Sequence, residues 1–398
     1  IVGWLISAAV RKERFMDFLA KTTDEMTAME IRHMNTVKEL AGECLVLLEN
    51  DGTLPIRNPG RIAIFGNGAR HTVKGGGGSG EVNTRSNVNF CDGLAEAGFE
   101  IASTGWLDRY DEIYNSTLSE YLTEVDRLAK ERNTAAINIM FEKAFVAPPM
   151  PEVTEEDVAI AGADTAIFVI SRDSSEGRDR TPTKGDYYLT DDEESILDFV
   201  IHHFDKVIVL LNVGAVIDMS RLKHRAGVSA ILLVGQLGSF TGNIVADALT
   251  GKTNPSGKLV DTWAKTYEDY PFATDFSSQN GNTDDEFYKE GIYVGYRYFD
   301  SFGILPLYPF GYGKSYTTFS HEVVDIIQQG AEVKVAVRVT NTGSEFAGKQ
   351  VIQAYFSAPE GDIDRPYQEL CGYAKTGLIE PGESDTVIIV IPIDEFRC

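Results

Sequence analysis

Residues 165–212 read "TAIFVISRDSSEGRDRTPTKGDYYLTDDEESILDFVIHHFDKVIVLLN", and this stretch indicates the fold class. It begins and ends with the apolar runs 165–171 and 206–212, which are continuous rather than alternating. Continuous runs are typical of strands buried on both faces. Between them lies a helical pattern opened by a capping box of Thr190 and Glu193. Strand, helix and strand in succession predict an α/β fold with a mostly parallel sheet sandwiched by helices.

Further apolar runs and helical patterns occur on both sides of this stretch. The apolar runs 60–66 ("GRIAIFG") and 230–234 ("AILLV") predict further strands, and the helical pattern at 91–98 leads back toward another strand. Residues 12–50 have apolar positions three and four apart, which predicts helices that lead into the first core element. Residues 98–150 are polar, partly helical and proline-rich at their end. We expect them to form an excursion from the sheet without a core of their own.

The pattern changes after "NPSGKLVDTW" (254–263). Residues 264–318 are rich in Tyr, Phe, Gly and Asp, which indicates a long connector held down by aromatic side chains. From residue 332 onward, alternating strands separated by turn residues predict a small antiparallel sandwich. The length of 398 residues suits two or three domains. The predicted division is a helical lead-in (1–40), an α/β sandwich domain (41–265), an aromatic-rich connector (266–318) and a small all-β domain (319–398).

Charge, the N-terminal sequence and cysteine content limit the expected partners and cellular compartment. With 60 acidic and 36 basic side chains, the net charge of −24 repels phosphate backbones, so nucleic acid is not an expected partner. The opening "IVGWLISAAVRKER" has too short an apolar run to span a bilayer, and its charges follow that run rather than precede it as in a signal peptide. The four cysteines form no CxxC pair, which suits a reducing, cytoplasmic compartment. The chain begins with Ile rather than Met, which leaves targeting open.

An acidic residue follows the first apolar run quoted above. In "SRDSSEGRDR" (171–180), Glu176 lies five residues beyond that run, and open α/β sheets bind ligands beyond the carboxyl ends of their strands. A carboxylic acid that donates a proton near neutral pH needs a raised pKa, which enclosure or a second carboxylate would supply. Pairing with Arg178 or Arg180 would act in the opposite direction. From local sequence alone, a surface knot of ion pairs is the favoured alternative.

A glycine-rich loop, "KGGGGSG" (74–80), follows the strand predicted at 60–66. Gly75, Gly77 and Gly80 formally match the dinucleotide fingerprint GxGxxG, but Gly75 lies ten residues beyond Phe65 instead of at the strand end. The remaining alternatives are a flexible tip, or a backbone that lies close against a ligand such as a sugar.

The other polar candidates give weaker signals. The six histidines are scattered, and we expect His202 and His203 to pack on a helix rather than bind a metal. Asn212 and Gly214 end a strand on the same side of the sheet as Glu176. They are interpreted either as lining a site or as a simple turn.

Taken together, the chain resembles glycoside hydrolase family 3, the β-glucosidases and their relatives, over residues 40–395. The tyrosine-rich and "NPSGKL" segments are the most specific. The resemblance implies an α/β sandwich domain that bears the general acid/base, followed by a fibronectin type III-like domain. It is carried, in order, by "ECLVLLENDGTLPI", "RIAIFGNGA", "KGGGGSG", "ISRDSSEGRDR", "VIVLLNVGAVIDM", "ADALTGKTNPSGKLVDTW", "EGIYVGYRYFDSFGILPLYPFGYGKSYTTFS" and "QELCGYAKTGLIEPGES".

The resemblance also implies roles for individual residues. Glu176 matches the glutamate of the family motif "SGEGxDR", the general acid/base, although here Ser175 departs from the motif. Ser79 matches the serine of the family loop "KGGxGSG" that approaches the sugar, and Gly78 and Lys74 of this loop are further candidate substrate-binding residues. Neither a metal nor a cofactor is expected.

One expected part is not in these residues. Family members carry the nucleophilic aspartate on a (β/α)8 barrel in an "SDW"-type motif, which the 398 residues do not contain. In a permuted subgroup the barrel follows the other two domains, so we expect a barrel domain elsewhere in the full-length protein as a partner.

The implied function is part of a retaining β-glycosidase of the β-glucosidase type, acting on a β-glucoside or a short β-linked oligosaccharide. The alternative is a non-catalytic module, derived from this family, that binds sugar or protein. A nucleotide-binding enzyme depends on the GxGxxG match alone. The sugar, the linkage and a homo-oligomeric state are left open.

Overall fold

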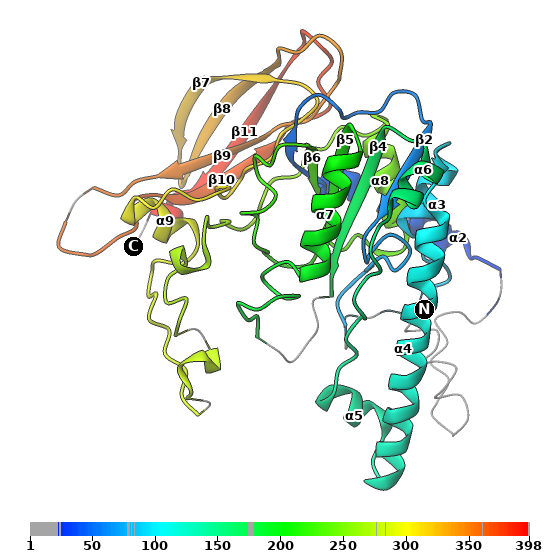
Figure 1. Ribbon diagram of the computed structural model, residues 1–398. Helices are drawn as coiled ribbons and strands as arrows, with labels where there is room; N and C mark the ends of the chain where they lie inside the picture. The colour runs from blue at the N-terminus through cyan, green and yellow to red at the C-terminus, as the bar shows by residue number, and fades with distance from the viewer. Residues whose placement is uncertain are drawn as a thin grey trace.

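A six-stranded sheet lies at the centre of the α/β part of the chain (Figure 1). The computed structural model describes residues 23, 25–77, 80, 82, 84–173, 179–275, 277–282, 284–359 and 361–396. The strand order is β1-β6-β5-β4-β2-β3. The neighbours from β3 to β6 are parallel and β1 is antiparallel to β6, so the predicted mostly parallel sheet is confirmed. The strands are β1 (Val46–Asn50), β2 (Arg61–Phe65), β3 (Glu100–Ile101), β4 (Thr165–Arg172), β5 (Lys206–Val213) and β6 (Val228–Leu233).

Strand β1 corrects the prediction that residues 12–50 are helical. Its Leu47 and Leu48 are fully buried, and the connector protects its outer edge because the backbone N–H of Lys314 donates to the carbonyl of Leu47 at 2.8 Å. The helical prediction holds for α2 (Ala28–Ala41), which begins with a capping box. A run of adjacent apolar residues satisfies helical and strand spacing equally, so the pattern does not distinguish the two. Residues 12–22 and 24 lie outside the described part.

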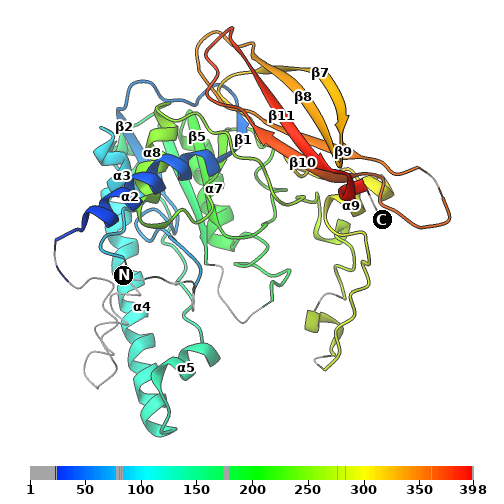
Figure 2. The same cartoon turned by 180° about the vertical axis from the view of Figure 1, so that it is seen from behind.

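Helices cover both faces of the sheet (Figures 1 and 2). On one face, α3 and α8 pack backbone to backbone, because a Cβ on Gly93 would lie 2.1 Å from the carbonyl carbon of Gly242. On the other face, the ring of Phe65 from β2 contacts Trp106 of α4 at 5.4 Å and Phe204 at the end of α7 at 6.0 Å. The helices are α3 (Phe90–Glu96), α8 (Thr241–Leu249) and α2 on the first face, and α4 (Thr104–Glu131), α6 (Glu155–Ala161) and α7 (Asp191–His203) on the second.

Helix α4 corrects the expectation for residues 98–150. Its first half belongs to the main core, where Trp106 and Tyr110 are buried. Its second half extends beyond the sheet with α5 (Ala136–Glu142), and here Val125, Ala129 and Ile139 form a small cluster of their own. Helix α4 is amphipathic, and the charged residues of its exposed face make the segment polar on average although its other face is apolar.

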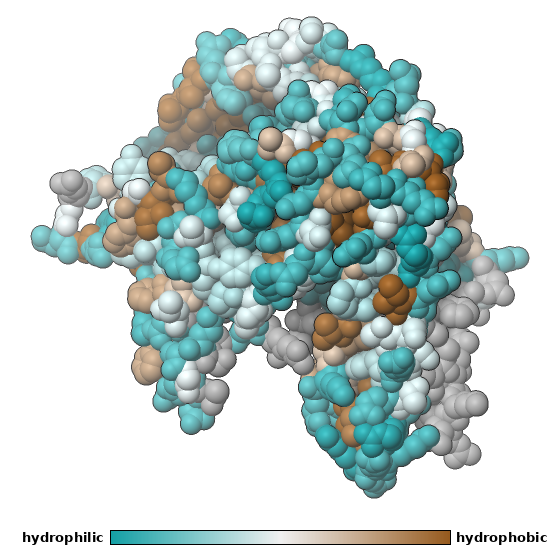
Figure 3. Space-filling model, viewed as in Figure 1, coloured by the Kyte–Doolittle hydropathy of each residue, from teal (hydrophilic) through white to brown (hydrophobic). Residues whose placement is uncertain are grey.

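The C-terminal strands form the predicted antiparallel sandwich. A three-stranded sheet of order β11-β8-β7 faces a two-stranded sheet of β10 and β9. The sequence pattern did not reveal β7, because a bulge between Val323 and Asp325 shifts its alternation. The exposed side chains of β7 give the hydrophobic surface seen over this strand in Figure 3. The strands are β7 (Phe319–Gln329), β8 (Glu332–Asn341), β9 (Val351–Phe356), β10 (Glu369–Lys375) and β11 (Ser384–Pro392).

Side chains of the connector and of "NPSGKL" join the two parts. Tyr308 is fully buried, and its carbonyl accepts a 2.9 Å hydrogen bond from the backbone N–H of Trp263. Asn254 donates its amide N–H to the carbonyl of Ala347 in the small sandwich at 2.9 Å and accepts the N–H of Tyr316 at 2.9 Å. The connector is therefore packed around Tyr308 and Tyr316, as its composition predicts, whereas its residues 284–289 are exposed, so the prediction holds for only part of it. The domain boundaries stay predictions.

Candidate functional site

The order of the strands marks the point between β2 and β4 as the expected place for a ligand. From β2 the chain adds β3 on one side and then returns to add β4, β5 and β6 on the other. Open α/β sheets bind ligands beyond the carboxyl ends of the strands at such a reversal. The loops at this point are 66–89 and 173–190, and every candidate catalytic or substrate-binding residue predicted from the sequence belongs to one of them.

Of those candidate residues, only Lys74 is described. Its ammonium group donates to the carbonyl of Val82 at 2.8 Å and lies 3.4 Å from the hydroxyl of Thr84, so it holds its own loop together. Its carbonyl accepts the backbone N–H of Gly238 at 2.9 Å, which joins this loop to the one after β6. Glu176, Ser79, Gly78 and Arg178 lie outside the described residues, and their roles stay predictions.

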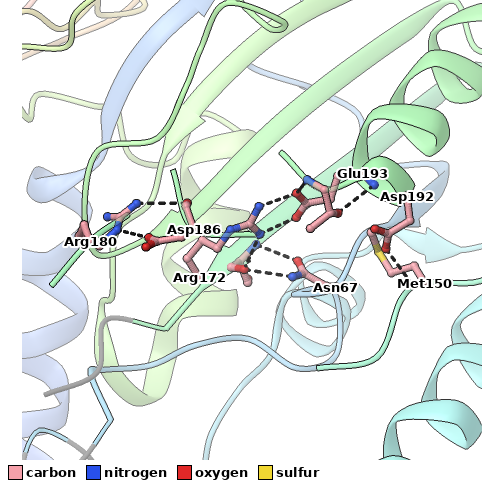
Figure 4. Close-up of polar contacts among 9 residues, drawn as sticks. Asn67, Met150, Arg172, Arg180, Asp186, Asp192 and Glu193 are labelled. Carbon is pink, nitrogen blue, oxygen red and sulfur yellow. Dashed lines mark hydrogen bonds and ion pairs between the residues drawn. The ribbon is translucent and has the colours of Figure 1, made fainter. Parts of the chain in front are cut away.

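The loop after β2 crosses directly over the end of β4. The side-chain amide of Asn67 accepts the N–H of Ser171 at 2.8 Å and donates to its carbonyl at 3.0 Å (Figure 4). Gly66 has φ of +105°, and a Cβ there would lie 2.1 Å from the carbonyl oxygen of Val169. A Cβ on Gly68 would lie 1.9 Å from the hydroxyl of Ser171. Only glycine permits this approach, and "GNG" directly after a strand was the sequence signal for it.

Asn212, at the end of β5, forms hydrogen bonds to the loop after β2, to the end of β4 and to the loop after β6. Its side chain is 0% exposed. Its Oδ1 accepts the N–H of Val73 at 2.7 Å and the hydroxyl of Ser171 at 2.8 Å, while its Nδ2 donates to the carbonyls of Val73 at 2.8 Å and Gly235 at 2.6 Å. The sequence left open whether Asn212 lines a site or forms a turn. In the structure it is a buried junction beneath the site.

A buried ion pair marks the start of the loop after β4. Both terminal nitrogens of Arg172 lie 2.5 Å from the carboxylate of Glu193, and the two side chains are 12% and 2% exposed (Figure 4). The same carboxylate accepts the backbone N–H of Thr190 at 2.9 Å, which confirms the predicted capping box of α7. Sequence reasoning found the capping box but missed the arginine.

A second arginine marks the end of the same loop. Arg180 pairs with the carboxylate of Asp186 (Figure 4). Its Nη2 donates to the carbonyls of Asp186 at 3.1 Å and Val216 at 3.0 Å. Asp186 also accepts the backbone N–H of Thr181 at 2.7 Å. The ion-pair alternative from the sequence therefore holds for Arg180, with Asp186 as its partner.

His71 holds the loop after β2 against α4. Its ring is stacked on Tyr114 with centroids 3.8 Å apart, and its Nε2 lies 2.8 Å from the carboxylate of Asp111. Arg70 donates to Asp108 at 2.7 Å and to Asp111 at 2.8 Å. Burial lowers the pKa of His71, although the charge of Asp111 acts in the opposite direction. The neutral imidazole therefore donates Nε2–H to Asp111 at neutral pH.

Acidification is expected to weaken this part of the fold. The unfolded state binds the His71 proton at a pKa of about 6.5, and the folded state binds it only at lower pH. The contribution of the neutral His71 to the free energy of unfolding is therefore fully present above about pH 6.5. It is lost as the pH falls through the pKa of His71 in the folded state. The variant His71→Gln should show a weaker fall in the free energy of unfolding between pH 7.5 and 5, by about 1.4 kcal/mol per unit of pKa shift. Urea unfolding followed by tryptophan fluorescence measures this difference.

His203 provides a control of opposite sign. It is stacked on Phe199 at 3.9 Å, which agrees with the predicted packing role, and Nε2 lies 2.9 Å from Glu155. The hydrogen bond to the Phe199 carbonyl, with help from Glu155, raises its pKa. His203→Gln should therefore remove stability that is present below about pH 6.5 and is lost as the pH rises through the folded pKa. Parallel pH profiles for wild type and both variants would contradict these assignments.

The described residues contain no group of three or more His, Cys, Asp or Glu side chains that could hold a metal ion. No helix among the described residues is long and apolar enough to cross a membrane.

Comparisons with known proteins match this architecture. Residues 45–296 match the glycosyl hydrolase family 3 C-terminal domain, and residues 350–398 match a fibronectin type III-like domain. Beta-glucosidase A of Butyrivibrio fibrisolvens is 36% identical over 95% of this chain and 48% of its own length. The beta-glucosidase of Ruminococcus albus is 33% identical over 90% of this chain and 36% of its own length. This chain thus spans half or less of the length of these relatives.

A solved structure gives the same picture. Beta-glucosidase 3B from Thermotoga neapolitana, in complex with alpha-D-glucose, superposes with a TM-score of 0.77 at 39% identity, over 93% of this chain and 50% of that one.

Proposed function

Since this chain belongs to glycoside hydrolase family 3, we propose that it is the part of a retaining β-glycosidase, of the β-glucosidase type, that supplies the general acid/base. The observation that carries the proposal is the position of "SSEGRDR" directly after β4, at the reversal of strand order. The names of the relatives support the β-glucosidase type.

Glu176 would act twice in this mechanism. It first protonates the glycosidic oxygen as the bond to the leaving group breaks, and a carboxylate from outside this chain attacks the anomeric carbon. It then removes a proton from the water that hydrolyses the glycosyl-enzyme. Retention requires the two carboxyl groups to lie about 5–5.5 Å apart, so the active site is shared between this chain and a barrel domain of the full-length protein.

The loop after β2 would contribute the sugar contacts from this side. Ser79, Gly78 and Lys74 belong to it, and Asn67 and Asn212 hold its base beside the end of β4. The substrate would be a terminal β-linked glucose-like residue of a β-glucoside or a short β-linked oligosaccharide. The glycines of the loop let the backbone approach such a ring closely.

An assay of two proteins tests the divided site. The full-length protein should release nitrophenol from p-nitrophenyl β-glucoside, whereas the 398-residue chain alone should show no rate above background, because one carboxyl of the pair is not enough. Hydrolysis by the chain alone would contradict the shared site. Glucose binding by a full-length protein without hydrolysis would support the module instead, and stabilisation by NAD or ATP would indicate a nucleotide site.

A further inference from the structure

The loop that carries Glu176 has an arginine at each end, and the two arginines are anchored on different elements. Arg172 ends β4 and is held at the start of α7, because its partner Glu193 belongs to the first turn of that helix. Arg180 is held next to the segment after β5, because it bonds to the carbonyl of Val216. The ends of the loop are therefore attached to separate parts of the sheet domain.

The contacts of Arg180 require the shape of a guanidinium group. Nε faces one oxygen of the Asp186 carboxylate while Nη2 donates to two backbone carbonyls. The other Asp186 oxygen accepts the N–H of Thr181 at 2.7 Å and its hydroxyl at 3.0 Å. A lysine has one ammonium nitrogen in place of this planar fork and cannot reproduce the arrangement. The pair thus closes residues 180–186 into one unit and attaches that unit to the segment after β5.

These contacts also separate Arg180 from the chemistry itself. Among the described residues, Nε and Nη2 of Arg180 bond to Asp186 and Val216, so these two nitrogens hold the protein together rather than a substrate. A general acid acts only when it lies within hydrogen-bond reach of the atom that it protonates. An error of about 1 Å in such placement can lower a rate about 10²-fold.

We propose that Arg180, together with Asp186, is a positioning residue for the general acid/base. The pair fixes the C-terminal end of the loop, and Arg172 with Glu193 fixes its N-terminal end. This inference rests on the proposed function of Glu176. It predicts that loosening the anchor damages proton donation specifically, rather than the whole reaction.

Leaving-group dependence distinguishes this role from a merely structural one. Arg180→Lys and Arg180→Met are made in the full-length enzyme, and kcat/KM is measured with 2,4-dinitrophenyl β-glucoside, which needs no acid, and with methyl β-glucoside, which does. We expect kcat/KM to fall at least about 10-fold more for the methyl glucoside than for the dinitrophenyl glucoside. Asp186→Asn should change the ratio in the same direction, because the amide loses the charge and its NH2 group cannot accept the bond from Arg180 or from Thr181 that a carboxylate oxygen accepts.

Arg225→Lys is the matched control. Arg225 forms a comparable ion pair with Asp198 of α7, but it precedes β6 and so lies at the amino end of the parallel strands. We expect Arg225→Lys to leave the ratio of the two kcat/KM values unchanged. Thermal midpoints of all variants are recorded, so that a loss caused by unfolding is recognised by its equal effect on both substrates.

The outcomes separate the two hypotheses when Glu176→Ala is assayed in parallel. If Glu176→Ala shows leaving-group dependence and the Arg180 variants do not, the positioning role is overturned while the proposed function stands. If Glu176→Ala affects both substrates equally or not at all, the proposed function fails and this inference fails with it. Equal losses on both substrates in Arg180→Met, with Glu176→Ala selective, assign Arg180 a structural role only.

Discussion

Replacing Glu176 with Ala in the full-length enzyme is expected to lower kcat/KM for alkyl β-glucosides by about 10²- to 10⁴-fold, the usual contribution of a general acid/base. Alkoxide leaving groups need a proton as the bond breaks, so their release depends on the acid. Dinitrophenolate leaves without one, and kcat/KM for the activated aryl glucoside should stay within about 10-fold of wild type.

The same variant tests the second role of Glu176. Hydrolysis of the glycosyl-enzyme needs a base to deprotonate water, so kcat for the activated substrate should fall even though kcat/KM does not. Azide needs no deprotonation, and it should restore kcat and yield β-glucosyl azide. Glu156→Ala, which removes an exposed carboxylate from α6, is the control and should behave as wild type. Unchanged rates on both substrates in Glu176→Ala would eliminate the assignment.

Replacing Glu193 with Ala is expected to destabilise the sheet domain by about 3–5 kcal/mol, because it leaves the buried Arg172 without its charged partner. The Nε of Arg172 is buried and has no hydrogen-bond partner among the described residues, so the terminal nitrogens depend on Glu193 and on the Ser171 carbonyl. Unfolding followed by tryptophan fluorescence reports on this domain, since Trp106 and Trp263 lie in its core.

A double variant separates the loss of a partner from the loss of packing. In Arg172→Met/Glu193→Leu both charges are replaced by apolar side chains of similar size, and buried pairs replaced in this way are often neutral or stabilising. We expect the double variant to recover the part of the loss that comes from the unpaired Arg172, but not the part that comes from the capping bond to Thr190, which Leu cannot accept. If Glu193→Ala lowers the free energy of unfolding by less than about 1 kcal/mol, the pair contributes no more than an exposed ion pair, and the prediction is wrong.

The central strands of the sheet could be predicted because a strand buried on both faces is apolar at successive positions of the sequence. Strands β4 and β5 lie inside the sheet and are therefore apolar at nearly every position, as their burial confirms. The capping box of α7 involves residues three apart, so it too could be read from the sequence. Strand β1 was missed because four adjacent buried residues, 45–48, suit a helix and a strand equally well.

In the candidate site, too, local features could be predicted from the sequence and contacts between distant segments could not. The strand pattern and the family motifs, both local in sequence, determined where the loop with Glu176 belongs and which fold carries it. Only the tertiary structure decided that Asn212 joins Val73, that Arg172 pairs with Glu193, and that Arg180 holds Asp186. These contacts depend on which strands become neighbours and on how loops cross their ends. No periodicity along the chain encodes that arrangement, because it arises only when separate segments are packed against one another.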